Sequence, residues 1–349
     1  MIGLSPLRVV LYAALLAAVV ALPYTQGEFR VTQFSYVGVF AIALVGLSIL
    51  TGITGQISLG HGGFMAIGAY VTGILATKYD VPELATVPLG GLVAGFVGFL
   101  FGFPALRLAG VYLALATFAF ALIVPSVAIA MGEFTGGTAG ILLDLPTSPV
   151  GALTPDKWLY FVTWAIALVL FVSAVLFVNG KRGRALRAVR DNELAATSSG
   201  VSISRYKTLA FGVSAFYAGV AGSLYAILNF IVTPGTFPVT LSILLLAGLV
   251  IGGATSLIGV ILGAIFVEFI PLYAGDVLGP VVNFLQRVQV PIDDVDPTTP
   301  GVPSVVYGVI LLLVLLIAPT GLAGLPGRVG ALTKRVYSRL NVPERRANT

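Results

Sequence analysis

The chain has 349 residues, of which 58% are apolar and 9% are charged, whereas about 25% of residues carry charge in soluble domains. With a mean hydropathy of +1.03, it has too few polar groups to cover a surface that faces water. The absence of cysteine and the single histidine exclude disulfides, thiolate metal sites and histidine-rich metal sites. We therefore predict an all-α polytopic membrane protein embedded in the lipid bilayer, with no bound metal and no nucleic-acid partner.

The apolar segments predict about ten membrane spans, because a helix that crosses a bilayer needs about 20 mostly apolar residues. Eight are separate runs: Val9–Leu22, Phe34–Leu50, Leu59–Thr77, Leu84–Phe103, Val111–Met131, Trp158–Val178, Leu209–Val232 and Val305–Ala318. Two more come from Val239–Tyr273, which is too long for one span and is interrupted by the Gly-rich residues 252–256. Eight spans with re-entrant segments fit the same pattern and remain an alternative.

The distribution of charge predicts the orientation, because lysine and arginine near the spans collect on the cytoplasmic side. If ten spans alternate from a cytoplasmic N-terminus, 15 of the 19 basic residues fall on the inside, and both termini are cytoplasmic. Residues 1–327 then form a transmembrane domain, with a cytoplasmic loop at 181–207 and an extracytoplasmic loop at 274–302. Residues 328–349 form a basic cytoplasmic tail.

The segment 181–207 is strongly polar and carries nine charges, too many for insertion into a bilayer. It predicts a short amphipathic helix with one charged face and one face of small residues, among them Ala185, Ala188 and Val189. Arg187 and Asp191 stand four residues apart and can pair, and Gly200 suits a helix end. The small face and the mixed charge indicate docking to another protein, whereas a solvated cytoplasmic loop is the plainer alternative.

A second unusual segment, residues 50–70, combines glycines with polar side chains inside an apolar region. Such segments occur at membrane depth only when buried in protein or lining a water-filled path. We name as translocation-path candidates Thr54, Gln56, Ser58 and His61. His61 could equally be a satisfied interfacial histidine. A similar Gly-rich element at residues 252–264 suggests a corresponding segment in the second half of the chain.

Glycines have a simpler explanation as well, since small residues four apart let membrane helices pack closely. Pairs of this kind are Gly91/Gly95, Gly98/Gly102 and Gly259/Gly263.

The chain also lacks a Gly-x-x-x-x-Gly-Lys-[Ser/Thr] phosphate loop, a Gly-x-Ser-x-Gly elbow and a His-Glu-x-x-His motif, which disfavours a membrane enzyme. Glu268 is the one carboxylate well inside a predicted span, so an ion-driven secondary carrier remains an alternative.

Two long motifs resemble a known family. They are the segment from Thr51 to Tyr70 and the segment from Gly183 to Ala196 with its continuation through residues 204–222. Both are similar to the LivM-type permease subunit of branched-chain amino acid ABC importers. The segment 135–141 and the Gly-rich element at 252–263 also resemble that family, so the similarity extends from about residue 37 to residue 319.

This resemblance implies that the chain is no enzyme and binds no cofactor, while ATP is used by a partner. The implied partners are a homologous second permease subunit, ATP-binding-cassette ATPase subunits and an extracytoplasmic solute-binding protein, in the cytoplasmic membrane of a prokaryote. The resemblance also implies ATPase-coupling residues: Gly183, Arg184, Arg187, Arg190, Asp191, Asn192, Glu193 and Gly200. Branched-chain amino acids are the implied substrates, and urea or amides are the alternative within the family.

Overall fold

The computed structural model describes residues 19–105, 107–108, 110–144, 148–149, 151, 153–257, 259–287, 308–309 and 312. The first and last predicted spans, Val9–Leu22 and Val305–Ala318, lie largely outside the described residues, as do the tail 328–349 and the second half of the loop 274–302. The described elements in chain order are α2 (Glu28–Leu47), η1 (Ser48–Ile53), α3 (His61–Tyr79), α4 (Glu83–Ala105), α5 (Val111–Ala130), α6 (Gly132–Thr135), β1 (Ile141–Leu142), α7 (Pro155–Asn179), α8 (Lys181–Asp191), α9 (Glu193–Ser198), α10 (Ile203–Asn229), β2 (Ile231–Val232), η2 (Pro234–Thr236), α11 (Val239–Gly252) and α12 (Gly259–Arg287).

Six helical segments in the described residues are long and apolar enough to cross a membrane: Glu28–Ile53, Glu83–Ala105, Val111–Ala130, Pro155–Asn179, Ile203–Asn229 and Pro234–Gly252. Each overlaps a predicted span. The predicted span at 59–77 is also helical as α3, but its glycines, His61 and Lys78 lower its hydropathy, and it is not among the six. The chain is thus a polytopic helical membrane protein, and the count of ten spans stays a prediction.

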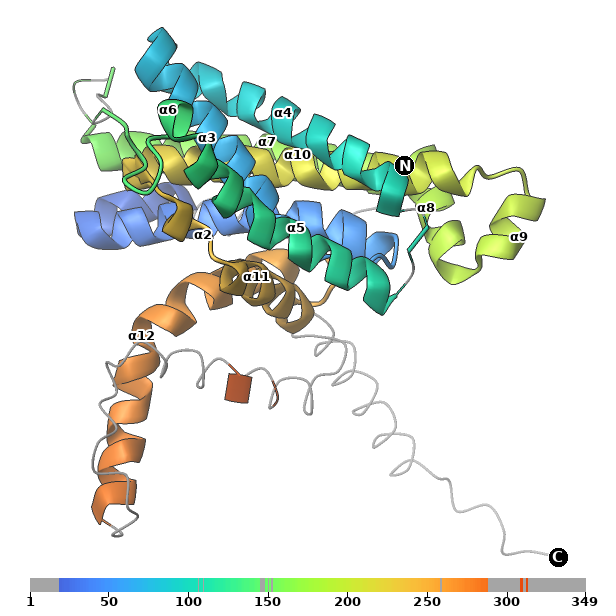
Figure 1. The fold of residues 1–349 in the computed structure, drawn as a ribbon. Helices are drawn as coiled ribbons and strands as arrows, with labels where there is room; N and C mark the ends of the chain where they lie inside the picture. Colours follow the sequence, from blue (N-terminus) through green and yellow to red (C-terminus); the bar gives the residue numbers. More distant parts are fainter. Residues whose placement is uncertain are drawn as a thin grey trace, which may run out of the picture.

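Helices α2, α3, α4, α7 and α10 run side by side as a bundle with α8 and α9 at one end, while the C-terminal part of α12 projects away from it (Figure 1). Helix α2 occupies the interior, where every residue from Val37 to Leu47 is buried, and it packs against α7, α10 and α12. Helices α4, α5 and α7 instead keep large apolar side chains exposed, including Phe96, Leu115 and Leu176. Exposed apolar faces of this extent suit contact with lipid.

Glycines form the contact between α3, α4 and α10. The face of α4 that carries Gly91, Gly95, Gly98 and Gly102 lies on α10, so that a Cβ at Gly98 would collide with the Cβ of Ala215. Likewise, a Cβ at Gly263 on α12 would overlap the Gly248 carbonyl of α11. The prediction that the paired glycines serve close helix packing is therefore confirmed.

Two local features differ from the predicted boundaries. Strands β1 and β2 pair antiparallel, Ile141 with Val232 and Leu142 with Ile231, which adds a two-residue ribbon to an otherwise helical fold. Helix α12 continues to Arg287, so Tyr273 is not its end as we predicted. Apolar residues recur at helical spacing beyond Tyr273, at 277, 278, 281, 282 and 285, which explains the longer helix.

Candidate coupling site

The C-terminal end of α2 passes into a π-helix, η1, formed by residues Ser48–Ile53. This geometry is rare and often accompanies functional sites. Two hydrogen bonds mark its end. The Thr54 hydroxyl donates to the Ile49 carbonyl at 2.7 Å, and the backbone N–H of Gln56 donates to the Leu50 carbonyl at 3.1 Å. Gly55 follows with φ +75°, a left-handed conformation that glycine adopts without strain.

The two Gly-rich segments of the sequence meet at η1. Helix α11 ends at Gly252, and Gly253 turns the chain with φ +109° toward α12. The Ser48 hydroxyl of η1 donates a 2.8 Å hydrogen bond to the Ala254 carbonyl in that turn. A Cβ at Gly52 would overlap the same carbonyl. The backbone of η1 and the α11–α12 turn are therefore in direct contact.

The third member of this junction is α8, which carries Arg190. Its Nη1 donates a 2.6 Å hydrogen bond to the Gly52 carbonyl. Its stem lies over Gly55, where an added Cβ would come within 3.1 Å of the Arg190 Cγ. We call η1, the α11–α12 turn and Arg190 the junction. It joins two segments that the sequence singled out separately, the charged segment and the Gly-rich segment.

Helix α8 is held against the bundle by a buried stripe of Gly183, Leu186 and Val189. Gly183 is required there, because a Cβ would collide with the Val178 backbone. Of the predicted small face, Val189 is buried but Ala188 is exposed. The buried stripe of α8 recurs every three residues, at Gly183, Leu186 and Val189, and Ala188 lies beside that stripe.

The predicted ion pair between Arg187 and Asp191 is wrong: no such pair is found within the described residues. Arg187 Nη1 donates instead to the Val178 carbonyl at 3.0 Å, and Arg184 Nη1 donates to the Asn179 carbonyl at 3.3 Å. Both carbonyls belong to the last turn of α7, where backbone acceptors lack helical partners and attract cations. These acceptors outcompete the exposed Asp191.

Helix α9 is a separate short element tied back to α10. The Asn192 side-chain oxygen accepts from the Ala195 N–H at 3.0 Å and caps the helix, and Gly200 follows its end with φ +81°, as predicted. Lys207 at the start of α10 forms an ion pair with Glu193 at 2.6 Å. The position of α9 is thus fixed relative to α10.

One exposed residue was missed by the sequence analysis. Leu194 of α9 is 82% exposed, although it stands among charged and small residues. Its side chain is fully available for contact with a partner at that end of the bundle. The signal in the sequence was a single leucine inside a polar stretch.

The four translocation-path candidates lie together between η1 and the start of α3, and all are buried. Three are engaged with backbone: Thr54 as described, Ser58 through its Oγ, which accepts from the Gly60 N–H at 3.3 Å, and His61. The His61 ring bonds the Ala43 carbonyl through Nε2 at 2.8 Å and ties α3 to α2. The Gln56 Nε2 has no partner within the described residues.

The sequence was compared with protein families and with known proteins. The family described as the permease component of branched-chain amino acid transport systems matches residues 30–318. The LivM proteins of Salmonella typhimurium and Escherichia coli, high-affinity branched-chain amino acid transport system permeases, are each 35% identical over 278 residues, covering 72% of this chain. The BraD permease of Pseudomonas aeruginosa is 25% identical over 265 residues, covering 69% of this chain and 83% of BraD.

The chain spans 65% of the length of each LivM relative. No solved structure matches it. The family match extends from α2 to the last described residue and includes all three parts of the junction. The chain therefore belongs to the family of permease components of branched-chain amino acid transport systems.

Proposed function

We propose that this chain is a membrane-spanning permease subunit of an ATP-binding-cassette importer and forms half of the path for a branched-chain amino acid. The single observation that carries the proposal is the junction. There, Arg190 of the charged segment holds the Gly52 carbonyl of the Gly-rich segment. If a separate ATPase drives transport, the helix on which it docks must be bonded to a membrane segment so that its movement is passed on.

In this proposal the chain crosses the cytoplasmic membrane of a prokaryote ten times, with both termini inside. Helices α8 and α9 then lie in the cytoplasm, as their charge demands. ATPase subunits dock on that surface, a homologous second permease completes the path, and a solute-binding protein delivers substrate from outside. The chain hydrolyses nothing itself, and ATP is bound and used by the partner.

Mechanically, the ATPase moves α8 and the junction passes the movement on. Helix α8 follows α7 directly and contacts α10 and η1, so a displacement reaches three membrane helices at once. The Arg190 bond pulls on η1, and the Ser48 bond carries the displacement to the α11–α12 turn. Gln56 and its neighbours lie at the point where η1 leads into α3, which supports their place along the path.

The test is ATP-driven uptake of L-leucine by proteoliposomes that contain the four kinds of subunit. Reversing Arg187 and Arg190 to Glu should lower uptake at least about tenfold, because both arginines lose carbonyl partners. Arg182→Glu is the matched control, since Arg182 is exposed on the same helix and lies outside the junction. It should retain near-normal uptake. Normal uptake by the double variant would contradict the proposal that Arg187 and Arg190 couple the ATPase to transport.

Two alternatives give different results in the same assay. A self-contained ion-driven carrier would move substrate under an ion gradient without ATP or partners, and Glu268→Gln would abolish that transport. A urea or amide permease of this family would be ATP-driven but would ignore L-leucine and accumulate urea or acetamide. Leucine uptake that needs ATP and the binding protein supports the proposal over both.

A further inference from the structure

The connection between η1 and α3, residues 54–60, has no helical structure. It begins at the junction, where an added Cβ at Gly55 would meet the Arg190 stem. Near its other end, the backbone N–H of Leu59 donates to the Thr117 hydroxyl of α5 at 2.9 Å. The connection is thus held by α8 at one end and by α5 at the other.

The far end of the connection, where α3 begins, lies well inside the membrane. There the His61 ring bonds the Ala43 carbonyl of α2, and the Gly62 N–H donates to the Ser242 hydroxyl of α11 at 2.9 Å. Both partners lie about ten residues before the junction ends of η1 and α11, which at 1.5 Å per residue is roughly 15 Å. Since the hydrocarbon core is about 30 Å thick, residues 54–60 cross much of its junction half.

Exposure alternates along the connection with a period of two residues, the pattern of an extended chain. Gln56 is 6% exposed and Ser58 is 0% exposed, whereas Ile57 between them is 43% exposed. Gly55 is exposed as well, and Leu59 is half-buried. One side of the connection therefore faces the protein interior, and the other side is open and apolar.

The polar residues on the inner side hold the backbone in place. The Ser58 hydroxyl accepts from the Gly60 N–H, and the Thr51 hydroxyl of η1 donates to the Gln56 carbonyl at 3.0 Å. Because Gln56 and Ser58 are buried, they present almost no surface to a solute. The large side chain that this connection presents outward is Ile57.

Lipid is a poor cover for the open side. Neither the N–H nor the carbonyl of Ile57 forms a hydrogen bond with another residue in the described part of the chain. Non-helical backbone at membrane depth is tolerated only inside protein or beside water, because hydrocarbon offers its peptide groups no partner. Leu122 of α5 is 51% exposed but belongs to a helix, whose backbone is paired internally, so it can face lipid.

We propose, on the basis of the proposed function, that Ile57 lines the cytoplasmic half of the translocation path. Its side chain gives the path an apolar surface at this depth, and water in the path serves its peptide groups. The polar residues on either side of Ile57 shape the path by fixing the backbone and do not meet the solute. Apolar constrictions of this kind control passage through many membrane pores.

The test places single thiols in the chain, which has no cysteine, and assembles it with its partner subunits. Inside-out vesicles that enclose the binding protein and L-leucine are supplied with ATP, and a membrane-impermeant cationic methanethiosulfonate is added during turnover. Ile57→Cys should react at least about tenfold faster than Leu122→Cys, because the thiolate is the reacting form and lipid suppresses ionisation. Ser58→Cys is the matched control for burial and should react as slowly as Leu122→Cys.

Labelling should also change transport in one variant alone. Ile57→Cys keeps a weakly polar side chain and should move leucine before labelling, whereas the attached cation should lower transport at least about tenfold by placing charge in the constriction. Labelled Leu122→Cys should transport normally. Leu59→Cys, on the same open side, repeats the experiment if Ile57→Cys does not assemble.

The proposal is overturned if Ile57→Cys reacts as slowly as Leu122→Cys during turnover, since the second permease or lipid would then cover the side chain. It is also overturned if labelled Ile57→Cys transports normally, or if Ser58→Cys reacts faster than Ile57→Cys. Each of these results with ATP-driven leucine transport in wild type removes the path residue alone. Absent transport in wild type removes the proposed function, and the labelling rates still report which side chains face water.

Discussion

At the scale of single residues, small side chains and backbone carbonyls make the junction possible. Gly52 presents its carbonyl to Arg190 while its bare Cα faces the Ala254 carbonyl. Arg190 is exposed, so its bond contributes less to stability than a buried charged bond does. We therefore expect changes at the junction to alter coupling more than folding, except where they insert atoms into the contact.

Gly52→Ala inserts such an atom. The new Cβ would collide with the Ala254 carbonyl, and overpacking of this kind typically costs about 1–3 kcal/mol. We expect a lower melting temperature in detergent and reduced uptake. Gly235→Ala is the control, because its Cβ would meet only the Thr233 hydroxyl at 3.7 Å, and it should melt as wild type does. Equal melting temperatures for the two variants would contradict the close contact at Gly52.

His61→Leu separates a structural from a path role for the histidine. The substitution removes the 2.8 Å hydrogen bond between His61 Nε2 and the Ala43 carbonyl, and loss of a buried hydrogen bond costs about 0.5–1.5 kcal/mol. We expect the melting temperature to fall, and uptake to fall only in proportion to folded protein. Uptake lost at an unchanged melting temperature would assign His61 to the path instead.

At the scale of elements, hydropathy and charge predicted the central helices and the exposed charged segment at 181–207. Paired glycines predicted the close contact of α4 with α10. The π-helix could not be predicted, because nothing in the residues Ser48–Ile53 distinguishes it from a continuing α-helix. The Arg187–Asp191 pair failed for a related reason, since the competing carbonyls of α7 are tertiary neighbours that helical spacing does not reveal.

Leu194→Asp tests α9 as a docking element. Leu194 is 82% exposed, so the change should leave the fold intact, while a charge in place of an apolar anchor should weaken ATPase association at least about tenfold. Copurification of the ATPase with tagged permease measures this. Leu194→Met keeps an apolar side chain of similar size and should copurify normally. Undiminished association of the Asp variant would place the docking contact elsewhere.

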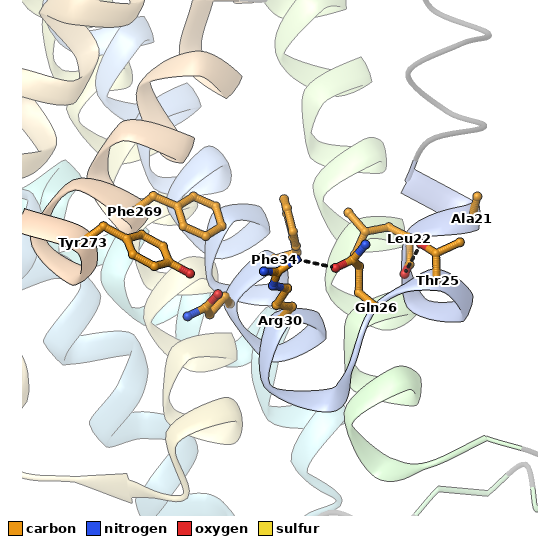
Figure 2. Close-up of a pocket in the computed structure, with 9 residues that line it drawn as sticks. Ala21, Leu22, Thr25, Gln26, Arg30, Phe34, Phe269 and Tyr273 are labelled. Atoms are coloured by element: carbon orange, nitrogen blue, oxygen red, sulfur yellow. Dashed lines mark hydrogen bonds between the residues drawn. The ribbon is translucent and has the colours of Figure 1, made fainter. Parts of the chain in front are cut away.

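At the scale of the whole molecule, α2 and η1 connect two sites that the sequence did not link. A pocket lined by Arg30, Phe34 and Phe269 (Figure 2) lies at one end of Glu28–Ile53 and the junction at the other. The Gly-rich and charged segments were found from the sequence, but their contact through Arg190 depends on folding. The pocket was missed, because Arg30 and Phe269 are far apart in the chain and only the packing of α2 on α12 brings them together.

The orientation is open to a direct test, because the chain contains no cysteine and each introduced thiol is unique. Ser198→Cys in α9 should react with an impermeant maleimide only in inside-out vesicles. Lys157→Cys at the start of α7 should react only in right-side-out vesicles. Labelling of both thiols from the same side would contradict the predicted topology.

The most direct test of the central claim is the amount of leucine imported per ATP hydrolysed by the reconstituted importer, compared between wild type and Arg190→Gln. The variant keeps α8 in place through Leu186 and Val189 but loses the charged bond to Gly52. We predict that ATP hydrolysis continues while the ratio falls about tenfold, equivalent to roughly 1.4 kcal/mol of lost coupling. A ratio equal to that of wild type would show that the energy of ATP reaches the membrane helices by another route.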